Sequence, residues 1–123
     1  MITYAKVVAS LKRAVAAKGE GYVYEAPGGP GEDCYYDNAN FDPGYYPPGE
    51  SGCIVGWVAR DLFGTDVDFI EGNSAEEQPW AADLEKKAVD LLKNVQFLQD
   101  GGSAWGNAVA MGISTTATGI KGV

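Results

Sequence analysis

The chain contains no histidine and only two cysteines among its 123 residues. Histidine is the commonest general base and catalytic metal ligand, so its absence removes the usual partner of a Ser or Cys nucleophile. The two cysteines, Cys34 and Cys53, are too few for a disulfide framework or a zinc site. The sequence therefore predicts a non-enzymatic protein with no catalytic residues, no metal site and no cofactor.

Long apolar runs and basic residues are also scarce. No stretch approaches the roughly 18 apolar residues that a membrane span needs, and residues 1–19 lack the apolar core of a signal peptide. The chain has 9 Lys and Arg against 17 Asp and Glu, a net charge of −8. Binding to nucleic-acid phosphates requires clustered cations. We therefore expect a cytoplasmic protein that binds neither nucleic acid nor a membrane.

Four stretches have the apolar spacing of amphipathic helices. They cover residues 2–18, 52–63, 81–99 and 103–114. Ser51 is placed to cap the second stretch at its N-terminus. Gly19, Gly64 and Gly101 follow the first three stretches, where glycine commonly ends a helix. The sequence therefore predicts about four helices.

The segment between the first two predicted helices has a different character. Tyr22-Val23-Tyr24 and Cys34-Tyr35-Tyr36 favour β structure, and a Gly/Pro-rich turn separates them, which predicts a short irregular hairpin. The prolines at 43, 47 and 48 remove backbone donors and restrict the residues before them. Residues 42–49 are therefore expected to form an ordered loop.

These patterns predict a mainly α fold with a minor α+β component. We expect one compact domain over residues 1–114, with the hairpin and a Tyr/Gly/Pro-rich loop at about 20–50, and a flexible tail at 115–123. The segment between Cys34 and Cys53 is flexible enough to let them pair. In a reducing compartment, however, two thiols packed as small apolar groups are expected.

Tyrosines and acidic residues concentrate in one window. No basic residue lies between Lys18 and Arg60, whereas six of the seven tyrosines and seven acidic residues do. Tyrosine supplies a large contact area at low entropic cost. The candidate protein-binding residues are Tyr35, Tyr36, Asp37, Asp42, Tyr45, Tyr46 and Glu50. The alternative is that these tyrosines cover the helical core and the acids only solvate the loop; Tyr45-Tyr46 is the pair most expected to be exposed.

Two motifs resemble a known group of proteins. Cys53-Ile54-Val55-Gly56 opens the second predicted helix, and Gln99-Asp100-Gly101-Gly102 followed by Trp105-Gly106 joins the third to the fourth. With the Tyr-rich segment before them, these motifs resemble small accessory proteins of actinobacterial bacteriophages, a group with no established activity. The resemblance implies a phage product made in the host cytoplasm, where such proteins commonly bind a host protein.

The leading hypothesis is therefore a non-enzymatic phage accessory protein that binds and perturbs a host bacterial protein, itself a monomer or weak dimer. One alternative is an acidic nucleic-acid mimic that inhibits a host DNA-binding or defence protein, an idea supported by the charge of −8. A carboxylate- or Cys-based enzyme is the third hypothesis, disfavoured by the missing histidine.

Overall fold

Four α-helices, joined by loops and short 3-10 turns, make up the part of the chain that the structure describes. The computed structural model describes residues 1–29 and 32–118. The helices are α1 (Tyr4–Lys18), α2 (Ile54–Phe63), α3 (Lys86–Asp100) and α4 (Trp105–Thr118), and the turns are η1 (Asn38–Asn40), η2 (Ala75–Glu77) and η3 (Pro79–Asp83). Within the described residues, the only β pairing is an isolated bridge between Ile2 and Leu84. The predicted mainly α fold of about four helices is confirmed.

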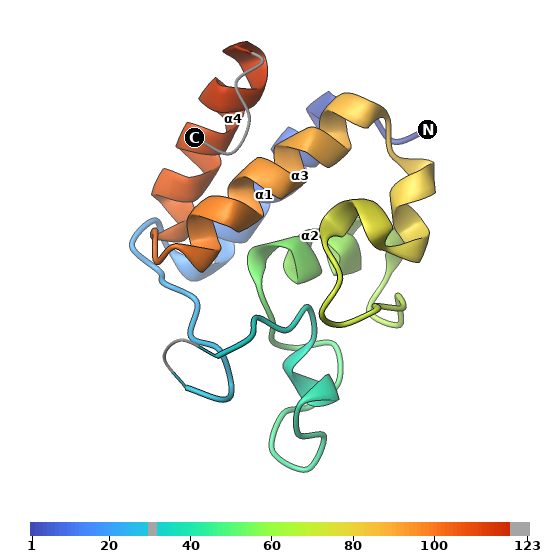
Figure 1. Cartoon of the computed structure of the whole chain (residues 1–123), viewed down its shortest axis with the longest axis vertical. Helices are drawn as coiled ribbons and strands as arrows, with labels where there is room; N and C mark the ends of the chain where they lie inside the picture. The colour runs from blue at the N-terminus through green and yellow to red at the C-terminus, as the bar shows by residue number, and fades with distance from the viewer. Residues whose placement is uncertain (30–31, 119–123) are drawn as a thin grey trace.

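The apolar faces of the four helices meet in one core. α3 and α4 lie side by side with the most extensive contact, α1 lies behind α3, and α2 lies beneath them (Figure 1). The fully buried side chains include Val7 and Leu11 of α1, Ile54 and Val55 of α2, Leu91 and Val95 of α3, and Trp105 and Ala108 of α4. Burial of these side chains supplies the main stabilising free energy of the fold.

The core position of α3 leads to a direct prediction. Leu91 and Val95 are both fully buried, so Leu91→Ala and Val95→Ala should each lower the free energy of unfolding by about 1–4 kcal/mol. Chemical denaturation measures this change. Met111→Ala, at an exposed position on α4, is the control and should change stability by less than about 0.5 kcal/mol. Equal midpoints for all three variants would mean that α3 does not pack centrally.

α2 begins later than predicted, and its cap comes from another helix. The expected start was residue 52 with Ser51 as the cap, whereas the helix starts at Ile54. The Ile54 N–H donates to the side-chain oxygen Oε1 of Gln99, which lies in the last turn of α3, at 2.8 Å. A tertiary contact therefore satisfies a donor that sequence reasoning assigned to a local cap.

α3 also begins later than predicted, at Lys86 instead of residue 81. The preceding residues form η3 and then an extended step at Leu84. This step pairs with the N-terminus, because the Ile2 N–H donates to the Asp83 carbonyl at 2.7 Å and the Glu85 N–H donates to the Ile2 carbonyl at 3.0 Å. Pairing with a distant segment thus interrupts a stretch whose own apolar spacing is helical.

The predicted hairpin does not form in the described part of residues 20–36. The Tyr35 carbonyl accepts from the Cys53 N–H at 2.9 Å, and the Asn38 N–H donates to the Ser51 carbonyl at 2.8 Å. The segment that was expected to pair with residues 22–24 therefore pairs with residues 51–53 instead. The Tyr35 N–H donates to the side-chain hydroxyl of Tyr24 at 3.1 Å. This hydroxyl takes the place of the backbone acceptor that a hairpin strand would have supplied.

α4 extends to Thr118, four residues beyond the predicted end at Ser114. Its last turns are tied to α3, since Asn94 donates to the hydroxyl of Thr116 at 2.9 Å and that hydroxyl donates to the Gly112 carbonyl at 2.7 Å. Residues 119–123 of the predicted tail lie outside the described residues. Among the helices that the structure describes, none has the length and hydropathy needed to cross a membrane.

Candidate functional site

One loop extends away from the helical body. It comprises residues 38–50 and is called the aromatic loop below; it is the turquoise and green segment furthest from α4 in Figure 1. η1 opens it, and the Tyr46 N–H donates to the Asp42 carbonyl at 2.9 Å to close a turn within it. The Asp42 carboxylate also accepts from the Gly44 N–H at 3.0 Å. The loop is therefore internally hydrogen-bonded, and residues 42–49 are non-helical, as their prolines predicted.

Glu71 holds the entry to the aromatic loop. Its carboxylate accepts from the backbone N–H of Tyr36 at 2.8 Å, from the N–H of Asp37 at 3.1 Å and from the side-chain amide of Asn40 at 2.7 Å. One charged side chain from a distant connection thus satisfies three donors. Hydrogen bonds to an ionised acceptor are stronger than neutral ones, so Glu71 is a principal anchor of the loop.

Arg60 holds the same segment from the opposite direction. This α2 residue is buried, and its guanidinium donates to the Tyr36 carbonyl at 2.7 Å. Burial lowers the pKa of Arg60, and the carboxylates of Asp37 and Glu71 oppose that shift. Arg60 and Glu71 therefore bind the carbonyl and the N–H of Tyr36, respectively, and their opposite charges compensate each other.

Asp37 joins the two ends of the aromatic loop. One carboxylate oxygen accepts from the Ala39 N–H at 3.0 Å and caps η1, and the other accepts from the Gly49 N–H at 2.9 Å.

The Tyr24 hydroxyl donates to the side-chain oxygen of Asn38 at 2.8 Å. Burial raises the pKa of Tyr24, so this hydroxyl stays protonated as a donor.

Two of the predicted contact residues have structural roles instead. Tyr36 is only 2% exposed, its ring stacks on Phe69 with centroids 5.3 Å apart, and its hydroxyl donates to the Asn73 carbonyl. Tyr36 therefore covers the core, as the alternative interpretation of the tyrosines proposed. The Asp37 carboxylate is occupied by two backbone donors. The Tyr36 ring is therefore not available to a partner, whereas the half-buried Asp37 side chain has a structural role within the loop.

The remaining predicted residues lie on the outside of the loop or beside it. Tyr45 is 75% exposed and packs edge-to-face on the half-buried Tyr46, with ring centroids 4.7 Å apart. Asp42 and Glu50 are exposed, and Tyr35 is half-buried. The outer face of the aromatic loop, defined as Tyr35, Phe41, Asp42, Tyr45, Tyr46 and Glu50, thus combines aromatic rings with carboxylates.

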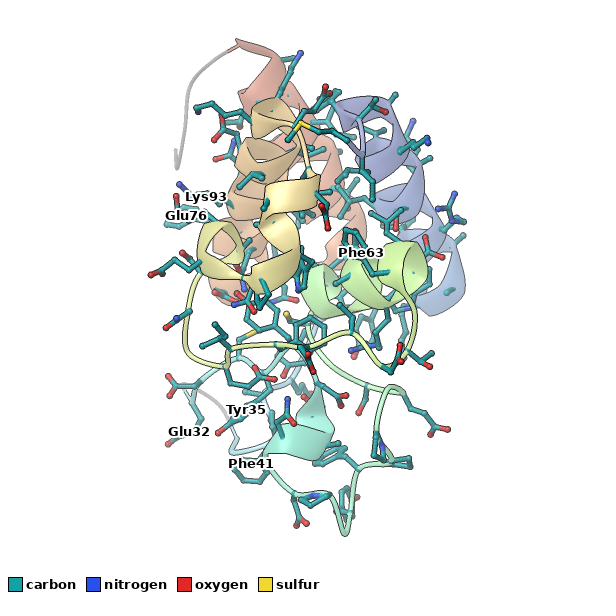
Figure 2. The ribbon with its side chains drawn as sticks, turned by 90° about the vertical axis from the view of Figure 1, so that its right-hand side faces the viewer. Glu32, Tyr35, Phe41, Phe63, Glu76 and Lys93 are labelled. Carbon is teal, nitrogen blue, oxygen red and sulfur yellow. The ribbon has the colours of Figure 1, made fainter. Side chains whose placement is uncertain are left out.

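Phe41 is the residue that sequence reasoning missed. It is 46% exposed and its ring packs edge-to-face on Tyr35, with centroids 5.5 Å apart. Figure 2 shows Phe41 and Tyr35 at the lower end of the molecule, well away from Phe63 on α2. The available signal was a lone aromatic residue between Asn40 and Asp42, two turn-favouring residues, which is a poor position for a core side chain.

Two hollows lie near the base of the aromatic loop. One, of about 630 Å³, is bounded by the outer face of α3 and residues 72–74; the other, of about 550 Å³, is bounded by residues 24–29 and the end of α3. Asp33, Cys34 and Asp100 contribute to both. In the described part of the chain, no three His, Cys, Asp or Glu side chains are grouped so that they could hold a metal ion.

Comparison of the chain with protein-family models, with curated proteins and with solved structures finds no match.

Proposed function

We propose that this chain is a non-enzymatic phage accessory protein that binds and perturbs a host cytoplasmic protein. The outer face of the aromatic loop makes the contact. The phage origin and the host compartment rest on the resemblance of the Cys53–Gly56 and Gln99–Gly106 motifs. The protein acts as a monomer or weak dimer, and its partner is a host bacterial protein.

The observation that carries the proposal is the exposure of aromatic rings on a loop whose base is held by hydrogen bonds. Tyr45 and Phe41 are exposed although large apolar groups favour burial. The bonds of Asp37, Glu71 and Arg60 restrict the loop before any partner binds. A restricted loop loses little entropy on association, and aromatic anchors contribute a large share of binding free energy.

A nucleic-acid mimic remains the second candidate because of the net charge of −8. Such a mimic needs outward carboxylates that can replace phosphates. Asp37 and Glu71 instead direct their carboxylates at backbone N–H groups, which leaves Asp42 and Glu50 as the acids of the outer face. This distribution favours an interface anchored by aromatic rings over a phosphate-like surface.

A Cys-based enzyme receives less support. The hydrogen bond with Cys53 and burial both raise the pKa of Cys34, so little thiolate forms and reactions at this sulfur are slow, whereas the cysteine nucleophile of an enzyme needs a lowered pKa.

The test removes the two rings of the outer face together. Tyr45→Ala combined with Tyr46→Ala should weaken binding to the host partner at least about tenfold, because aromatic anchors dominate such interfaces. Their rings lie outside the core, so the melting temperature should change little. The partner is captured from an actinobacterial host lysate, identified by mass spectrometry and purified, and its affinity for each variant is then measured by calorimetry.

Phe97→Ala is the matched control, because Phe97 is 56% exposed but lies on α3. This variant should bind like the wild type. A marked thermal loss in the double variant, with unchanged affinity of its folded fraction, would show that the rings cover the core and would overturn the proposal. Loss of the partner as salt rises would favour the nucleic-acid mimic, because screening weakens long-range attraction.

A further inference from the structure

Cys34 and Cys53 flank the aromatic loop and meet at its base. Cys53 is fully buried at the N-cap of α2, and Cys34 is half-buried. The Cys53 N–H donates to the carbonyl of Tyr35, the neighbour of Cys34, at 2.9 Å. The Gln99 side chain joins the two segments, because its amide nitrogen lies 3.9 Å from the Cys34 sulfur and its Oε1 accepts from the N–H of Ile54, the neighbour of Cys53, at 2.8 Å. The fold thus places together two thiols that are 19 positions apart in sequence.

The two thiols differ in access. Cys34 is half-buried and contributes to the walls of both hollows near the loop base, which gives a small molecule an approach to this residue. Cys53 is covered by the surrounding core. Asp100 lines the same two hollows as Cys34, and the Gln99 side-chain amide donates to the Asp100 carboxylate at 2.8 Å. An accessible thiol beside a covered one is the arrangement of an attacking and a resolving cysteine.

We propose that Cys34 and Cys53 form a reversible disulfide site that exchanges with small-molecule disulfides such as oxidised glutathione and that closes the base of the aromatic loop. Cys34 loses its proton to Asp100 or water, and its sulfur attacks one sulfur of the small disulfide. One small thiol leaves, and a mixed disulfide remains on Cys34. Cys53 then attacks the Cys34 sulfur and releases the second small thiol.

The exchange is balanced in atoms and electrons. Two protein thiols and one small disulfide become one protein disulfide and two small thiols, so two electrons pass from the cysteines to the small disulfide. The proton that Cys34 releases passes through Asp100 or water to the first departing small thiolate, and the proton of Cys53 goes to the second. In a reducing compartment the dithiol is the resting form, and oxidising conditions shift the site to the disulfide.

Formation of this bond has a measurable effect on stability. A cross-link between residues 34 and 53 restricts the unfolded chain by closing a loop of about 20 residues. For a chain of this length we expect the melting temperature of the oxidised protein to exceed that of the reduced protein by about 5–10 °C. This inference concerns thiol chemistry and does not depend on the proposed function.

The experiment incubates the folded full-length chain with glutathione over a series of reduced-to-oxidised ratios. Remaining thiols are alkylated and counted by intact mass spectrometry. The wild type should pass from two alkylated thiols to none, without retained glutathione. Cys53→Ser should keep one glutathione on Cys34, because no resolving thiol is present. Cys34→Ser should leave Cys53 unmodified by glutathione, because the folded core covers it.

Three outcomes would overturn the proposal. The first is a glutathione adduct that persists on the wild type as it does on Cys53→Ser. The second is a wild type whose two thiols are both still alkylated at the most oxidising ratio. The third is an oxidised wild type that melts below the reduced one. Circular dichroism checks that each variant folds. If the buried hydroxyl of Cys53→Ser prevents folding, Cys53→Ala replaces it. The wild-type thiol counts and melting temperatures test the proposal even without the variants.

Discussion

Gly56→Ala is expected to lower the free energy of unfolding by about 4 kcal/mol or more. A Cβ at Gly56 would overlap the carbonyl oxygen of Tyr36, a backbone atom. That carbonyl cannot retreat freely, because Arg60 donates to it and Glu71 holds the adjacent N–H. The added methyl group must therefore do one of two things. It displaces the loop from α2 and exposes Arg60, or it distorts α2 itself. Urea denaturation measures the change.

The sign of this effect is diagnostic. In a helix without such a contact, Gly→Ala stabilises by about 1 kcal/mol through helix propensity. Gly101→Ala is the control, because a Cβ there would meet the Leu98 carbonyl at an ordinary 3.5 Å and its φ of −77° suits any residue. It should change stability by less than about 1 kcal/mol. A Gly56→Ala midpoint at or above the wild-type value would rule out the close approach of the loop to α2.

Glu71→Ala carries the second large effect, an expected loss of about 3–5 kcal/mol in the free energy of unfolding. The variant leaves the N–H groups of Tyr36 and Asp37 without their acceptor. It also takes a compensating negative charge away from the buried Arg60. Unpaired donors and an uncompensated charge both carry a full desolvation penalty. Thermal and urea unfolding measure the loss.

Hydrogen exchange shows where the stability is lost. Amides of the aromatic loop and of residues 36–37 should exchange much faster in Glu71→Ala, while the amides of α3 keep their relative protection. Glu76→Gln is the control, since the exposed Glu76 pairs with Lys93 on the outer side of the molecule, as Figure 2 shows. That variant should behave as the wild type. Unchanged loop exchange in Glu71→Ala would mean that other contacts hold the loop.

Glu71→Ala and the double Tyr45/Tyr46 variant together separate the roles of the tyrosines. Glu71→Ala releases the loop base without removing any aromatic ring, whereas the double Tyr45/Tyr46 variant removes two rings and leaves the base intact. If the outer face binds the partner as a pre-ordered surface, both changes weaken binding, but only the first lowers stability. The pair of measurements thus distinguishes an anchored contact surface from a lid over the core.

Local patterns in the sequence determined the four helices and the C-terminal ends of three of them, at Gly19, Gly64 and Gly101. The apolar spacing of α1 and α3 is strong enough to identify a buried stripe, because a helix repeats every 3.6 residues whatever it packs against. Gly19 and Gly64 end α1 and α2 with φ near +100°, a conformation that glycine adopts without steric cost. The ordered loop at 42–49 followed in the same way from its prolines. Each of these signals acts within a few residues.

Contacts between distant residues decided the remaining features. The start of α2 depends on Gln99, the start of α3 depends on Ile2, and the segment at Tyr35 pairs with Cys53 instead of with residues 22–24. A backbone donor can be satisfied equally well by a neighbour or by a residue far along the chain, and only the folded geometry selects between them.

The same reason explains the division among the tyrosines. Tyr36 and Tyr45 lie in similar Tyr-Tyr pairs in the sequence, yet one is 2% exposed and the other 75%. Tyr36 is drawn inward because Arg60, Glu71 and Phe69 offer its backbone and ring partners from three separate segments. The Tyr45 ring packs on its own neighbour, Tyr46. The composition of the segment placed both residues in a candidate contact surface. The tertiary structure determined which of the two faces solvent. Burial of a polar aromatic residue depends on its packing and hydrogen-bond partners, and these partners can lie far away in the sequence.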